Sequence, residues 1–107
     1  MYDDEKPYQT ESTRTVQGIM FCLPSRQPFI PYSCLVCSEL NEKQTELRFH
    51  YTHAVVTVTG KDLYFVHEAV IRFYLYVLRE GTSESPSPGS SRATAVTRIE
   101  ITEMTPE

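Results

Sequence analysis

The sequence has no cluster of basic residues and no long apolar segment, and these absences argue against two classes of protein. Its ten lysine and arginine residues are scattered, and the formal net charge is −4. Nucleic-acid binding needs clustered cations that neutralise phosphates, so we expect no nucleic-acid partner. The longest apolar stretch, residues 69–78, contains Arg72 and is far shorter than the roughly 20 residues of a membrane-spanning helix. We therefore expect no membrane insertion.

Three further features are scarce or missing. Residues 1–5 are mostly acidic and are not followed by an apolar stretch, which is unlike a signal peptide, so a cytoplasmic location is expected. The three cysteines are an odd number, which favours reduced thiols over a disulfide framework. The four glycines are isolated, so no phosphate-binding glycine loop is present.

The length and the composition along the chain indicate one domain. A chain of 107 residues has room for one modest core. Residues 1–12 are polar and predict a flexible tail, residues 13–103 form the expected domain, and residues 104–107 form a short second tail. Within the domain, residues 81–92 are rich in Ser, Pro and Gly and predict a flexible surface loop.

Alternating apolar residues predict several strands. The first covers residues 16–23, the second covers 29–40, and a turn at 41–44 leads to the third. The apolar parity changes between Tyr51 and Val56, which requires either a bulge or a tight turn at Thr52 and His53. A hairpin turn is favoured, because thirteen residues would be long for one strand. A last amphipathic strand is expected over residues 95–102.

One long helix is predicted over residues 63–79. Asp62 is the expected N-cap, and Gly81 is the expected left-handed residue that ends the helix. Val66, Val70 and Phe73 share a stripe at helical spacing. That stripe is expected to pack on four strand residues, which are Leu47, Phe49, Val56 and Val58.

Together these elements predict an α+β fold with two layers. The expected arrangement is an antiparallel β-meander with one long helix packed on one face, in the order β-β-β-β-α-β.

The expected helix is apolar well beyond its core stripe, and this predicts a partner interface. Tyr64, Ile71 and Leu75 lie on the flank of the stripe, where a single sheet would leave them exposed. A second copy that presents the same flank would cover them by two-fold symmetry. The leading hypothesis is therefore a small non-enzymatic module that acts through protein contacts, as a homo-oligomer.

The alternative hypothesis is a small-ligand or metal-binding domain that uses His50, His53 and His67 near the junction of strand and helix. Cys34 and Cys37 have a CxxC spacing, but within a strand they would point to opposite faces, so no zinc site is expected there. No nucleophile and base are paired by any recognisable spacing, and we expect neither catalysis nor a cofactor.

Overall fold

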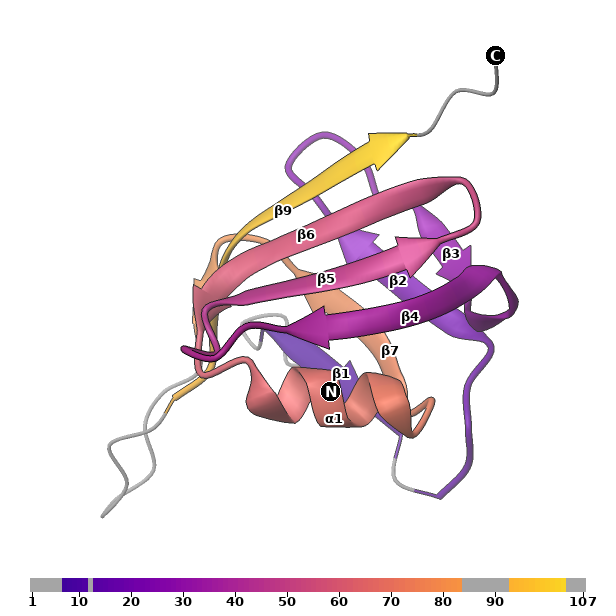
Figure 1. Ribbon diagram of the computed structural model, residues 1–107, viewed down its shortest axis with the longest axis horizontal. Coiled ribbons are helices and arrows are strands. Elements are labelled where there is room, and N and C mark those ends of the chain that lie inside the picture. The colour runs from indigo at the N-terminus through magenta and orange to yellow at the C-terminus, as the bar shows by residue number, and fades with distance from the viewer. Residues whose placement is uncertain (1–6, 12, 84–92, 104–107) are drawn as a thin grey trace.

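The computed structural model describes residues 7–11, 13–83 and 93–103. In these residues the chain is mostly β, with two sheets and one short helix (Figure 1). The expectations for residues 1–6, 12, 84–92 and 104–107, which include most of the Ser/Pro/Gly loop and the second tail, lie outside the described residues. Within the stretch that was expected to be a polar tail, Tyr8–Thr10 forms a strand.

The first sheet has four strands in the order β1-β7-β2-β3. Their bounds are Tyr8–Thr10 for β1, Leu75–Arg79 for β7, Gly18–Cys22 for β2 and Phe29–Pro31 for β3. Strand β7 pairs in parallel with β2 and antiparallel with β1. Parallel neighbours need a long crossover, and here the crossover contains most of the second sheet and the helix.

The second sheet has five antiparallel strands in the order β4-β5-β6-β9-β8. Their bounds are Leu35–Leu40, Glu46–Tyr51, Ala54–Lys61, Ala95–Glu103 and Thr82–Ser83 respectively. The hairpin turn predicted at Thr52 and His53 is confirmed, since β5 ends before these residues and β6 begins after them. Neither residue has a positive φ, so this hairpin avoids the backbone conformation that such residues disfavour.

The core lies between the two sheets. Figure 1 shows β4, β5 and β6 in front of β2, β3 and β7. The rings of Phe21 from β2 and Phe49 from β5 are 6.0 Å apart between centroids, which joins the two inner faces. Leu47, Phe49, Val56 and Val58 are fully buried, as the alternation predicts.

The expected two-layer fold with one long helix is wrong. The helix α1 covers only Tyr64–Ile71, and the residues expected to continue it form β7 inside the first sheet. Val66 and Val70 are buried as expected, whereas Phe73 is 45% exposed and does not belong to the core stripe. The helix contacts β4 and β7 and lies at one side of the two sheets (Figure 1).

The helix ends early because Phe73 adopts a left-handed conformation, with φ of 61°. The N–H of Phe73 donates to the carbonyl of Val70, and the N–H of Tyr74 donates to the carbonyl of Ala69. This pair of bonds is a Schellman motif with an aromatic residue in the place that glycine usually takes. The ring of Phe73 packs edge-on against Tyr32 at 5.0 Å, a contact that offsets part of the backbone cost.

The expected ends of the helix were also wrong. Asp62 has a φ of 52°, and Leu63 takes the N-cap position without any side-chain cap. Gly81 has a φ of 77°, but it lies in the turn between β7 and β8, where its N–H donates to the carbonyl of Val96. Asp62 therefore lies in the turn from β6 into α1, and Gly81 lies in the turn between two strands.

The expected strand at residues 29–40 is split in two. A short 3₁₀ helix, η1 (Tyr32–Cys34), separates β3 in the first sheet from β4 in the second. Pro31 begins this break, because proline cannot donate the next hydrogen bond of the ladder. The chain thus passes from one sheet to the other at η1.

Candidate functional site

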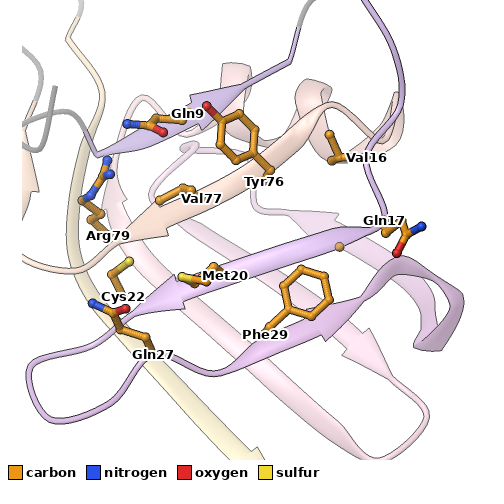
Figure 2. A pocket seen from close by; sticks show the side chains of 11 residues that line it. Gln9, Val16, Gln17, Met20, Cys22, Gln27, Phe29, Tyr76, Val77 and Arg79 are labelled. Carbon is orange, nitrogen blue, oxygen red and sulfur yellow. The ribbon is translucent and has the colours of Figure 1, made fainter. Parts of the chain in front are cut away.

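The outer face of the four-stranded sheet carries an apolar hollow of about 800 Å³. Met20 from β2, Phe29 from β3 and Val77 from β7 form a row across three neighbouring strands, as the strand register requires. Figure 2 shows this row together with Tyr76 and Val16. Phe29 is 52% exposed, and Met20 and Tyr76 are each 37% exposed. The sheet thus presents a continuous apolar surface to solvent.

Two local features of the backbone build this face. Strand β2 alternates, so that Ile19 and Phe21 are buried in the core while Met20 points outward. Strand β7 carries a bulge, because its pairing with β1 shifts between Gln9 and Thr10 and leaves Tyr76 without a direct partner. The bulge places Tyr76 and Val77 together on the outer face.

Gly18 allows the ring of Phe29 to lie over β2. A Cβ atom at Gly18 would come within 2.7 Å of the ring and within 2.5 Å of the carbonyl oxygen of Ile30. Both distances are too short for real carbon contacts, so a larger residue would push β3 away from β2. The glycine is therefore required by packing at this site rather than by a turn.

The hollow has few charges. Its lining includes three glutamine side chains, from Gln9, Gln17 and Gln27. Within the described part of the chain, the lining contains one charged residue, Arg79, and no acidic residue. Figure 2 places Arg79 with Cys22 and Gln27 at one end of the row. The described lining thus contrasts with the chain as a whole, which carries a formal net charge of −4.

The structure separates the three residues of the expected interface. Tyr64 and Ile71 lie on α1 and are 44% and 58% exposed. Leu75 is the first residue of β7 and is fully buried, so its side chain is unavailable at the surface. The expected patch is thus reduced to helix residues, and an interface at Tyr64 and Ile71 stays a prediction.

The three histidines occupy different surroundings. His67 on α1 has its Nδ1 3.4 Å from the hydroxyl of Ser38, and burial lowers its pKa below the ordinary value. His50 on β5 has its Nε2 2.6 Å from a carboxylate oxygen of Glu39 on β4. His53 is exposed in the hairpin turn, 6.4 Å from the ring of Tyr51 between centroids. Along β4, Ser38 and Glu39 point to opposite faces, so His67 and His50 are separated by the sheet.

The cysteines are likewise apart, and all three are free thiols. Cys34 is partly buried in η1 rather than in a strand, Cys37 is exposed on β4, and Cys22 is partly buried on β2. Cys37 lies directly opposite His50 in the ladder between β4 and β5. Cys34 and Cys37 therefore lie in different elements, despite their CxxC spacing. Cys37 instead has His50 as its cross-strand neighbour, which the spacing did not suggest.

Two tyrosines, Tyr32 in η1 and Tyr51 at the end of β5, are buried in the core. The hydroxyl of Tyr32 donates to the carbonyl of Leu75, whereas the hydroxyl of Tyr51 has no hydrogen-bond partner among the described residues. Burial raises the pKa of both hydroxyls well above the ordinary value, so both stay protonated at neutral pH. Both tyrosines belong to the hydrophobic core.

Met20, Phe29 and Tyr76 are surface residues that the sequence patterns above do not predict. One signal was present, because Ile19, Met20 and Phe21 are apolar at successive positions. A strand with apolar residues on both faces is typical of a strand that is covered on both faces. The outer face of β2 could thus have been proposed as a contact surface from the sequence.

The chain matches no known protein-family model, no curated protein and no solved structure. In the part of the chain that the structure describes, none of the helices has the length and apolarity needed to cross a membrane.

Proposed function

We propose that the protein is a non-enzymatic module that acts through protein contacts, and that the outer face of the four-stranded sheet binds a second copy of the chain. The observation that carries this proposal is the apolar row of Met20, Phe29 and Val77, with Tyr76 beside it, which lines a hollow on the outer face of the first sheet. Large apolar side chains that adjoin on a surface are typical of interaction sites.

A second copy is the occupant that suits this surface best. Two chains that each carry a formal net charge of −4 repel each other. This repulsion is weakest when the faces that meet carry few acidic residues. Among the residues that the structure describes, none of those lining the hollow is acidic, so two copies can meet there with little repulsion. The glutamine amides of the lining can both donate and accept hydrogen bonds, which suits a two-fold interface where each group meets its own kind.

The shape of the surface supports mutual packing. Phe29 and Tyr76 project from the sheet, and the hollow lies among them and Met20. In a two-fold arrangement, the projecting ring of one chain can fill the hollow of the other. Burying each large apolar side chain would contribute about 1.5–3 kcal/mol before the costs of association.

The proposal is tested by sedimentation equilibrium of the full chain and two variants. Tyr76→Lys places a charge on the proposed interface, and Ile71→Lys places the same charge on an exposed helix position as a matched control. The wild type and Ile71→Lys are expected to be dimers, while Tyr76→Lys is expected to be a folded monomer by circular dichroism. A wild-type chain that stays monomeric at high concentration contradicts the proposal.

A further inference from the structure

A cluster of three different side chains lies on the outer face of the five-stranded sheet. Cys37 and Glu39 are two residues apart on β4 and thus share a face, and His50 on β5 lies directly opposite Cys37. One ligand atom from each residue lies within 4.8 Å of the others. Within the described residues, this is the only group of three or more His, Cys, Asp and Glu side chains that comes so close together.

We propose that Cys37, Glu39 and His50 bind one Zn²⁺ ion. A thiolate sulfur, an imidazole nitrogen and a carboxylate oxygen are the three donor types that zinc takes in proteins. Zinc is borderline between hard and soft, so this mixed set suits it better than Mg²⁺ or Ca²⁺, which prefer oxygen ligands alone. Three protein ligands leave the fourth tetrahedral position open to water.

The distances are compatible with a tetrahedral ion after small side-chain movements. Zinc bonds of roughly 2.0–2.3 Å put neighbouring ligand atoms about 3.3–3.7 Å apart. The Nε2 of His50 and the carboxylate oxygen of Glu39 are 2.6 Å apart and would have to separate. All three ligand atoms lie within 4.8 Å of one another, so any pair that is wider than the tetrahedral distance would move closer by about 1 Å at most. Cys37 is exposed and the His50 and Glu39 side chains are 32% and 68% exposed, so all three have room to adjust.

The proton balance of the binding step is simple. Zinc displaces the proton of the Cys37 thiol, which leaves as a free proton when the zinc–sulfur bond forms. The Nε2–H of His50 donates to the Glu39 carboxylate, so this proton leaves Nε2 to solvent when the zinc–nitrogen bond forms, and the bound imidazole carries its ring proton on Nδ1. Arg48 lies directly opposite Glu39 in the ladder between β4 and β5. Its guanidinium is 3.5 Å from the carboxylate of Glu46, which offsets the positive charge of Arg48.

A bound ion would connect an edge strand to its neighbour. Strand β4 is at the edge of the five-stranded sheet, and its pairing with β5 is irregular between Leu35 and Cys37. Zinc held by two residues of β4 and one of β5 would fasten the strands just beyond this irregularity. Because the ion binds only the folded arrangement, it should also raise the midpoint of thermal unfolding.

The test uses the reduced full chain and Zn²⁺ in competition with a chromophoric chelator. We expect one Zn²⁺ per chain that survives dialysis, and at least a tenfold loss of affinity in Cys37→Ser and in His50→Gln, since even residues that only orient ligands cost about 10–100-fold when replaced. Cys34→Ser and His53→Gln are matched controls that remove a thiol and an imidazole elsewhere, and their affinity should equal that of the wild type.

A spectroscopic measurement distinguishes this site from non-specific binding. Co²⁺ in place of Zn²⁺ should give a thiolate-to-metal charge-transfer band that is absent in Cys37→Ser and present in Cys34→Ser. The proposal is overturned if the chain holds no Zn²⁺ after dialysis. It is equally overturned if the two control variants lose as much affinity as Cys37→Ser and His50→Gln.

Discussion

The hydroxyl of Tyr32 donates a hydrogen bond to the main-chain carbonyl of Leu75, with 2.6 Å between the two oxygens. Tyr32 lies in η1, where the chain passes between the sheets, and Leu75 begins β7. The bond therefore ties the crossover to the strand at the centre of the first sheet. Leu75 is fully buried, so the bond is shielded from water.

This relationship predicts a contrast between two tyrosines. Tyr32→Phe should lower the free energy of unfolding by about 1–3 kcal/mol, because it leaves the buried carbonyl of Leu75 without its donor. Tyr51→Phe should be nearly neutral or stabilising, because the hydroxyl that it removes has no partner among the described residues. Urea unfolding of both variants measures the difference. Equal losses would mean that Tyr51 makes a hydrogen bond after all.

A second contrast tests where the helix ends. Leu75→Ala should cost about 2–5 kcal/mol, since the leucine is fully buried in β7. Ile71→Ala should change stability by less than about 0.5 kcal/mol, because this residue is 58% exposed at the end of α1. Thermal or chemical unfolding gives both values. Similar costs at the two positions would favour one continuous helix and would refute the strand assignment of β7.

The third prediction concerns pH. Burial lowers the pKa of His67 in the folded chain below its unfolded value, so the unfolded chain binds the proton more readily. The stabilising effect of neutral His67 is fully present above the unfolded pKa, near 6.5. It is lost as the pH falls from there toward the lower folded pKa.

Unfolding experiments at pH 8 and pH 5 measure this effect. His67→Gln should lose less stability between these two values than the wild type, whereas His53→Gln, an exposed control, should follow the wild type. If the two variants lose the same stability as the wild type over this range, His67 does not contribute to the pH dependence.

Much of the second sheet could be predicted from the sequence. Strands β5, β6 and β9 each have one buried face, which alternating apolar residues predict. In β5, for example, the alternating residues Leu47, Phe49 and Tyr51 are all buried. The change of parity before Val56 located the hairpin turn correctly. These strands pair with neighbours in a simple order, so local pattern and tertiary structure agree.

The first sheet could not be predicted in the same way, and β7 shows the reason. Leu75 and Leu78 are both buried and are three residues apart, a spacing that indicates a helix. The bulge at Tyr76 produces this spacing within a strand, because it adds one residue between the two inward side chains. The strands that pair with β7 are more than fifty residues earlier in the sequence, so no local signal reveals them.

The candidate sites depend on the same long-range pairings. The contact of Met20 with Val77 across β2 and β7, and of Cys37 with His50 across β4 and β5, follows from strand register. A one-residue shift of register would send each side chain to the opposite face. The sequence shows that these residues are suited to contact or to ligation, but only the register brings them together.

The most direct test of the account is an isotope-filtered NOE measurement on an equal mixture of labelled and unlabelled chains. It detects only pairs of protons that belong to different copies. The account predicts intermolecular NOEs from the Met20 methyl group to the ring protons of Phe29 and Tyr76, because these side chains line the proposed interface. Intermolecular NOEs at Tyr64 and Ile71 instead, or none at a concentration where the wild type is fully associated, would contradict it.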